Sequence, residues 1–176
     1  TVGSADALPN CFVACHQVSY VDRFDMLKYS RPGSVFLLNT IYGPNEVWNT
    51  LPREMLKDII EKKLKFYVID AYQVAEATGM GSRINTIMQT CFFAISGVLP
   101  REEALAQIKH AIEKTYGKKG EAVVRKNFEA VDQSVANLHQ VAYPTEVSSS
   151  HSRRLPVPAE APVFVKEVLG EMINRN

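Results

Sequence analysis

The chain has 176 residues, of which 46% are hydrophobic and 22% charged, and its formal net charge at pH 7 is +1. These values are typical of one globular domain, and the near-zero charge argues against nucleic-acid or membrane-surface partners. No apolar run approaches the ~20 residues of a membrane span, and the first residues carry no secretory signal. Three cysteines without a framework spacing indicate a reducing compartment, with the cytoplasm as the expected location.

Three short apolar runs predict buried strands at residues 11–15, 34–39 and 65–70. Their continuous apolar character favours a parallel sheet that is covered on both faces. Helices are expected between them, over residues 21–29 and over residues 52–63. The alternation of strands and helices predicts right-handed parallel crossovers. The expected fold class is therefore α/β, a Rossmann-like three-layer sandwich with a parallel sheet and additional C-terminal helices.

The second half of the chain is expected to be helical. One helix opens at Pro100, and the next buries a stripe at helical spacing that consists of Val124, Phe128, Val131, Val135 and Leu138. We expect His110 and His139 on these helices, at the surface or its boundary. The Pro- and Ser-rich composition then predicts a linker over residues 144–176 with a possible short terminal helix. The α/β domain is accordingly assigned to residues 1–143.

The most informative stretch is a glycine-containing loop that leads into an apolar-faced helix, Gly79–Phe93. We expect the helix to begin near Ser82, whose hydroxyl can cap it. Its free amides and the neighbouring Arg83 suit an anion such as a phosphate. Asn85 and Gln89 are polar residues of the same helix that can face a ligand. The alternative is an ordinary loop before a core helix, with Arg83 merely solvated.

Three further polar residues stand at the carboxyl ends of predicted strands, where ligands of open parallel sheets bind. His16 can serve a ligand or can be structural, Asn39 is a weaker ligand candidate, and Asp70 can hold a ligand hydroxyl or cap the next turn. No catalytic motif is present, and we assign no catalytic residue. The cysteines are expected to be core thiols without a metal site, since no Cys-x-x-Cys occurs among Cys11, Cys15 and Cys91.

Five strings occur in a fixed order: Phe12-Val-Ala-Cys-His16, Tyr20-Val-Asp-Arg-Phe-Asp-Met-Leu27, Val35-Phe-Leu-Leu-Asn39, Leu64-Lys-Phe-Tyr-Val-Ile-Asp70, and Gly79–Phe93 with its Arg-Ile-Asn-Thr-Ile-Met-Gln core. Together they resemble the gamma-type domain of pyruvate:ferredoxin (or flavodoxin) oxidoreductase. The resemblance runs from Phe12 to about Tyr143, and the ordered set is more specific than any one string.

The resemblance implies a function that composition could not show. The family converts pyruvate and coenzyme A to acetyl-CoA and carbon dioxide, and its electrons pass to ferredoxin or flavodoxin. Thiamine diphosphate, Mg²⁺ and iron–sulfur clusters belong to other domains, so this chain is expected to bind no cofactor by itself. The gamma-type domain is implicated in coenzyme A binding and in dimer assembly. By this resemblance Ser82, Arg83 and Asn85, and more weakly Gln89, are candidates to face a coenzyme A phosphate.

The chain departs from the family pattern near its start. Phe12 follows Thr1-Val-Gly3 within nine residues, so the family's opening βα region is missing or replaced, which puts part of the pocket in doubt. Together with the absent initiating Met, this predicts an excised, N-terminally shortened fragment that is inactive alone. Its partners would be the other domains of the enzyme, in a bacterial cytosol or an organelle of an anaerobic eukaryote. The alternatives are a purely structural assembly domain and an unrelated free-standing binding module.

Overall fold

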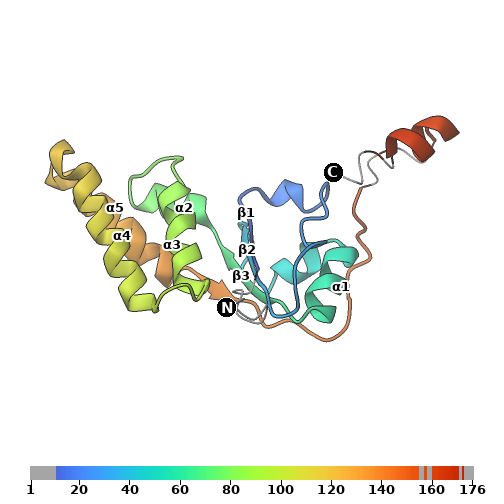
Figure 1. The fold of residues 1–176 in the computed structure, drawn as a ribbon, viewed down its shortest axis with the longest axis horizontal. Helices are drawn as coiled ribbons and strands as arrows, with labels where there is room; N and C mark the ends of the chain where they lie inside the picture. Colours follow the sequence, from blue (N-terminus) through green and yellow to red (C-terminus); the bar gives the residue numbers. More distant parts are fainter. Residues whose placement is uncertain (1–10, 155–156, 158–159, 171, 173–176) are drawn as a thin grey trace, which may run out of the picture.

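The computed structural model describes residues 11–154, 157, 160–170 and 172, and it contains a sheet with helices on both faces (Figure 1). The strands lie in the order β1 (Phe12–Cys15), β2 (Val35–Asn39), β3 (Lys65–Ile69) and β4 (His139–Gln140). β1, β2 and β3 are parallel, and β4 pairs antiparallel with β3. The three predicted strands and their parallel pairing are confirmed. The expectations about the first ten residues lie outside the described part.

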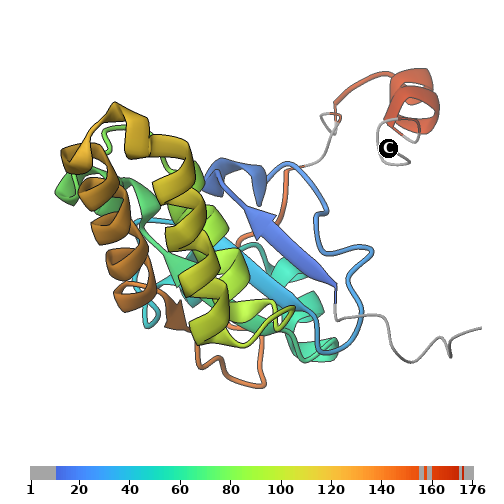
Figure 2. The same cartoon turned by 60° about the vertical axis from the view of Figure 1, so that its left-hand side comes forward.

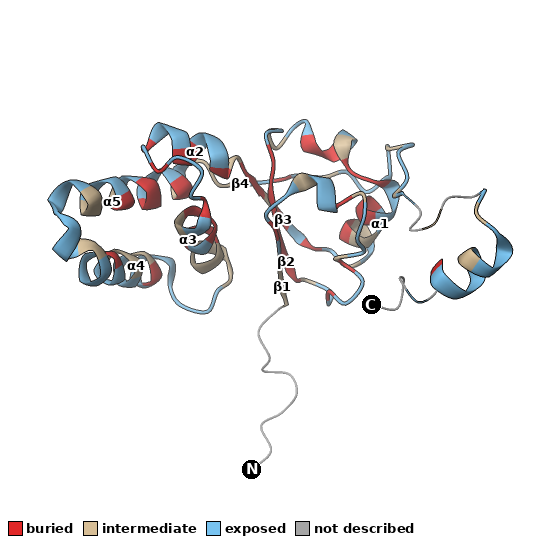
Figure 3. Ribbon diagram, turned by 90° about the horizontal axis from the view of Figure 1, so that it is seen from above, coloured by how far each residue is buried: buried red, intermediate tan, exposed pale blue. Residues whose placement is uncertain are grey.

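Helices cover the two faces of the sheet unequally. One face carries η3 (Val47–Thr50) and α1 (Arg53–Glu61), and the other carries α2 (Ala71–Ala77) and α3 (Asn85–Ile95). α4 (Arg101–Tyr116) and α5 (Glu121–Ala136) pack against each other and against α3, outside this layer (Figures 1 and 3). The predicted α/β class, with extra helices after the last parallel strand, is confirmed.

The core has one half on each side of β2. Every residue of β2 is buried, because the strand lies inside the sheet and helices cover both of its faces. On the α1 side, Phe36 of β2 stacks on Phe66 of β3 with ring centroids 5.2 Å apart. On the other side, Leu37 and Ile69 pack against α2 and α3. The sheet thereby fixes the positions of all the loops that follow its parallel strands.

The expected helix over residues 21–29 is absent. Between β1 and β2 the structure has a short 3₁₀ helix, η2 (Val18–Tyr20), followed by turns. Val21 and Leu27 are buried, but Phe24 is exposed. The carbonyl of Leu27 accepts hydrogen bonds from Ser30 Oγ and from Lys62 Nζ. Tertiary contacts thus satisfy backbone groups that a helix would satisfy internally. The burial of Val21 and Leu27, six residues apart, fits a series of turns as well as a helix.

Two expectations for the last helix are also corrected. Its most buried residues are Asn127, Ala130, Val131 and Ser134, so of the predicted stripe only Val131 is fully buried. Small residues on that face allow α5 to approach its neighbours closely. His139 does not lie on a helix: α5 ends at Ala136, and His139 forms β4 opposite Val68. This pairing depends on a strand distant in sequence, which helical periodicity cannot reveal.

The described residues after β4 run along the α1 side of the domain. Tyr143 stacks on Trp48, with ring centroids 5.2 Å apart, and donates a hydrogen bond to the Leu64 carbonyl at 2.7 Å. Further on, the Arg53 amide donates to the His151 carbonyl at 2.7 Å. A short helix, η5 (Val165–Gly170), lies within the range where a terminal helix was predicted. The division of the chain at residue 143 stays a prediction.

Candidate functional site

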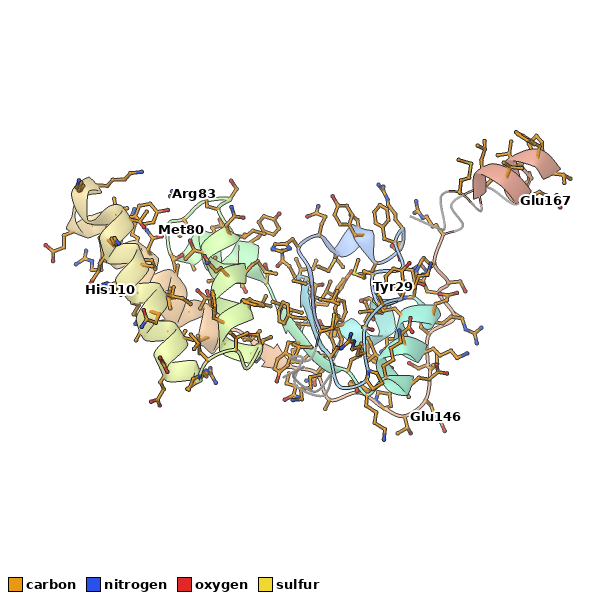
Figure 4. All side chains as sticks on the ribbon, viewed as in Figure 1. Tyr29, Met80, Arg83, His110, Glu146 and Glu167 are labelled. Atoms are coloured by element: carbon orange, nitrogen blue, oxygen red, sulfur yellow. The ribbon has the colours of Figure 1, made fainter. Side chains whose placement is uncertain are left out.

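The loop before α3 turns sharply at two glycines. Gly79 and Gly81 have φ angles of 68° and 64°, a region that residues with a Cβ rarely adopt. Between them Met80 is buried and its amide donates to the Ala75 carbonyl. The Nε of Arg83 donates to the Met80 carbonyl at 3.2 Å, so this side chain folds back on its own loop (Figure 4).

Ser82 does not cap the helix that follows. α3 begins at Asn85, and Ile84 stands at the capping position without a side-chain bond. The amides of Arg83 and Ile84 bond instead to the carbonyls of Met80 and Ser82. The prediction of a helix start near Ser82 is therefore wrong by about one turn. The helix therefore starts only after these two bonds, which follow the left-handed glycines.

Asn39 joins three elements where the parallel strands end. Its Nδ2 donates to the His16 carbonyl, just after β1, at 3.0 Å. Its Oδ1 accepts from the Ala71 amide, the first residue of α2, at 2.9 Å. The side chain is almost fully buried. Asn39 lies at the predicted end of its strand, and its side chain forms two internal bonds there.

Asp70 caps α2, since its Oδ1 accepts from the Gln73 amide at 3.0 Å. Of the two roles that the sequence left open, the geometry therefore provides the cap. Asp70 also lines a small hollow at the strand ends together with His16 and Asn39. The three residues lie at the ends of the parallel strands, as expected, and the hollow brings them together.

A larger hollow of about 450 Å³ lies between β1 and α3. β1 ends the sheet order, so its outer edge has no strand partner among the described residues. The hollow is lined by apolar and polar side chains from these two elements: Phe12, Ala14, His16, Asn85, Met88, Gln89 and Phe92. Phe12 and Phe92 meet edge to face, with ring centroids 4.8 Å apart. We call this space the edge hollow.

The edge hollow gathers part of the predicted site. Asn85 and Gln89 come from the first two turns of α3, and His16 reaches it from the end of β1. Ser82 and Arg83 lie on the preceding loop and do not line it. The apolar floor was missed as a site, although the helical spacing of Met88 and Phe92 marked them as residues facing the protein. Only the fold shows that this face borders an open strand edge.

A second hollow of about 400 Å³ lies between α3 and α4. Gln89 borders this space as well, together with residues such as Phe93, Leu99 and Ile108. The lining is mainly apolar and includes no charged residue. No local pattern predicts this hollow, because it depends on how α4 packs across α3.

The cysteines are free thiols at different depths. Cys15 and Cys91 are buried and Cys11 is half-buried, which fits the interpretation as core thiols. Burial raises the pKa of Cys91 to about 12. Within the described ranges no cluster of three or more metal-ligating side chains occurs. No helix among the described residues has the length and apolar character needed to cross a bilayer.

We expect Cys91 to resist alkylation by iodoacetamide at pH 8, because only the thiolate attacks the reagent. A pKa near 12 in place of about 9 reduces the thiolate fraction on the order of a thousandfold. Because folding raises this pKa, the neutral thiol contributes fully to the free energy of unfolding below about pH 9. The contribution is lost progressively as the pH rises toward 12. Mass spectrometry over time should show Cys11 modified first; equal rates at Cys11 and Cys91 would contradict the prediction.

The fold and the edge hollow define an α/β domain whose mostly parallel sheet presents a ligand-sized space beside an open edge. A family profile described as pyruvate ferredoxin/flavodoxin oxidoreductase matches residues 4–136. The chain therefore belongs to the pyruvate ferredoxin/flavodoxin oxidoreductase family, which confirms the resemblance.

Relatives support this assignment over nearly the whole chain. A putative pyruvate-flavodoxin oxidoreductase of Synechocystis is 52% identical over 165 residues, covering 93% of this chain and 14% of that protein. The pyruvate:ferredoxin oxidoreductase of Moorella thermoacetica is 44% identical over 157 residues, covering 89% of this chain and 13% of that protein. The chain thus spans about one seventh of the length of these relatives.

A solved structure supports the fold. The pyruvate oxidoreductase subunit PORC from Thermotoga maritima superposes with a TM-score of 0.54, over 78% of this chain and 68% of that one. Sequence identity between the two is 17%, so the likeness concerns the α/β architecture alone.

Proposed function

We propose that this domain binds coenzyme A for a pyruvate:ferredoxin or pyruvate:flavodoxin oxidoreductase. The complete enzyme would convert pyruvate and coenzyme A to acetyl-CoA and carbon dioxide and reduce ferredoxin or flavodoxin. Thiamine diphosphate, Mg²⁺ and iron–sulfur clusters would be held by its other domains, in a homodimer located in the cytoplasm or in an organelle of an anaerobic eukaryote. The observation that carries the proposal is the edge hollow in a domain of this family.

The edge hollow suits the pantetheine arm of coenzyme A in size and chemistry. Its volume of about 450 Å³ falls within the roughly 300–1,000 Å³ of typical small-molecule sites. Phe12, Met88 and Phe92 supply apolar surface, and the side-chain amides of Asn85 and Gln89 can donate to and accept from the amides of the arm. An apolar floor with a few polar groups is the usual composition of such sites.

Arg83 supplies the positive charge for the phosphate end. It is exposed, its Nε is used by the Met80 carbonyl, and its side chain forms no ion pair among the described residues. The terminal guanidinium nitrogens can therefore hold a phosphate in a bidentate manner. The neighbouring Ser82 hydroxyl is a second candidate donor on the same loop.

The test compares Gln89→Ala and Arg83→Ala in the complete oxidoreductase. We expect each to raise KM for coenzyme A at least about tenfold, which corresponds to about 1.4 kcal/mol of binding, while KM for pyruvate stays constant. Lys118→Ala, an exposed cation in the turn after α4, is the matched control and should change neither value. An unchanged KM for coenzyme A in both test variants would refute the proposed site.

The second candidate is a structural module that joins other domains without a ligand of its own. The uncharged hollow between α3 and α4 favours this role, because apolar surface of this kind marks interaction sites. The same kinetics separate the two functions. The structural role is correct if Gln89→Ala leaves KM for coenzyme A unchanged while Ile108→Asp releases the domain from the enzyme, as judged by limited proteolysis.

A further inference from the structure

Five large apolar side chains are exposed at the edge of the sheet where the parallel strands end. Their exposed fractions lie between 40% and 75%. The five residues are Tyr20, Phe24, Ile41, Tyr42 and Tyr72. Two of them follow β1, two follow β2 and one follows β3. Because the carboxyl ends of parallel strands meet at one edge, we group the residues that follow them as one surface, which we call the rim patch. Figure 2 shows β1 running directly into this region through η2.

The rim patch lacks the depth of a small-molecule site. Ile41 and Tyr72 border one hollow of about 160 Å³, and Ile41 and Tyr42 border another of about 160 Å³. Each is about half the lower limit of typical ligand pockets, roughly 300 Å³. A broad, shallow surface with exposed aromatic rings is typical of protein–protein contacts, in which tyrosine and phenylalanine are enriched.

The loop that carries two of these rings is held by a clasp, residues 151–154, which follows the family-matched region. His151 Nε2 lies 2.8 Å from Asp22 Oδ1, and the Arg154 amide donates to the Asp22 carbonyl at 3.0 Å. The guanidinium of Arg153 contacts both carboxylate oxygens of Asp25 at 3.3 and 3.4 Å. The clasp thereby grips the segment containing Tyr20 and Phe24, whose rings meet edge to face at 5.6 Å.

The clasp also changes the charge beside the rings. Asp22 and Asp25 would repel an apolar partner if they were free, because burying an unpaired carboxylate is costly. Here both have a partner on the clasp. Arg23, between them, is exposed and has no ion pair among the described residues. The loop that carries Tyr20 and Phe24 is thus held in place before binding, which reduces the ordering cost of association.

We propose that the rim patch is the docking surface for another domain of the same oxidoreductase, which presents apolar side chains and a carboxylate opposite Arg23. We infer this occupant from the length of the relatives. The chain covers 14% of its Synechocystis relative, so most of such an enzyme lies outside the chain and is available to cover the patch. The proposal rests on the complete oxidoreductase named under the proposed function, but not on coenzyme A binding.

The test places the photo-crosslinker p-benzoylphenylalanine in the complete oxidoreductase without coenzyme A, either as Phe24→p-benzoylphenylalanine or as Tyr29→p-benzoylphenylalanine. Tyr29, labelled in Figure 4, is 74% exposed and is not one of the five rim-patch residues. We expect position 24 to crosslink to a peptide outside these 176 residues, with at least about five times the yield of position 29. Mixing isotopically labelled and unlabelled enzyme distinguishes a domain of the same polypeptide from a second copy.

Hydrogen exchange on the Tyr20→Ser, Phe24→Ser double variant of the complete enzyme gives an independent measure. Exchange over residues 16–30 should become at least about fivefold faster, while residues of α1 keep their protection and so report an intact fold. The proposal is overturned if position 24 crosslinks only within this domain, only to the same peptide of a second copy, or no better than position 29. Unchanged exchange over residues 16–30 overturns it as well.

Discussion

Replacing Asn39 by alanine is expected to lower the free energy of unfolding by about 2–4 kcal/mol, since each buried group left without its partner costs about 1–3 kcal/mol. The substitution removes the bonds to the His16 carbonyl and to the Ala71 amide, which tie β1, β2 and α2 together where the strands end. Such a loss is a large part of the roughly 5–15 kcal/mol that holds a domain folded. Urea unfolding followed by circular dichroism measures it.

Asn49→Ala is the matched control for this change. Asn49 is exposed, and its Oδ1 accepts one bond, from Ser148 Oγ at 3.1 Å. Surface changes of this kind shift stability by about 0.5 kcal/mol or less. If the two alanine variants lose equal stability, Asn39 does not join the strand ends in solution.

The largest loss is expected for Phe36→Ala, at about 3–5 kcal/mol, because removing a buried phenylalanine forfeits its burial and leaves a cavity. Phe36 and Phe66 are both fully buried and stack on the α1 side of the sheet. The cavity would lie beside Met55 and Leu56 of α1, so α1 should lose hydrogen-exchange protection first. Chemical denaturation gives the total, and exchange gives its location.

Phe164→Ala provides the comparison, since that ring is 66% exposed and its removal creates no cavity. We expect a change of about 0.5 kcal/mol or less there. A loss below about 1.5 kcal/mol for Phe36→Ala would mean that the core collapses around the missing ring or that the stacking is not formed.

The candidate site was only partly predictable. The loop glycines and the polar residues of α3 carry a local signal, and both glycines indeed adopt φ angles that demand them. The start of α3 was missed because turn bonds at Met80 and Ser82 compete with capping. The joining of His16 with Asn85 and Gln89 in the edge hollow could not be read from spacing, since these residues lie on β1 and α3.

The residues after the family-matched region illustrate the same limit. Their Pro- and Ser-rich composition indicated a linker, yet His151 and Arg153 reach Asp22 and Asp25, more than a hundred residues away in the chain. No local sequence pattern predicts such a pairing, because each partner is an ordinary charged surface residue within its own segment. Only folding brings the clasp and the η2 loop together.

The sequence by itself determined the three parallel strands, α1, the long C-terminal helices and the glycine turn, because apolar runs, helical spacing and backbone sterics act over a few residues. The ordered strings beyond these local patterns also determined the family. The tertiary structure alone decided that residues 21–29 form turns, that His139 forms a strand, and that an open edge of β1 meets α3. Those outcomes depend on which distant group satisfies a backbone bond or covers an apolar face, and that is settled only when the whole chain packs.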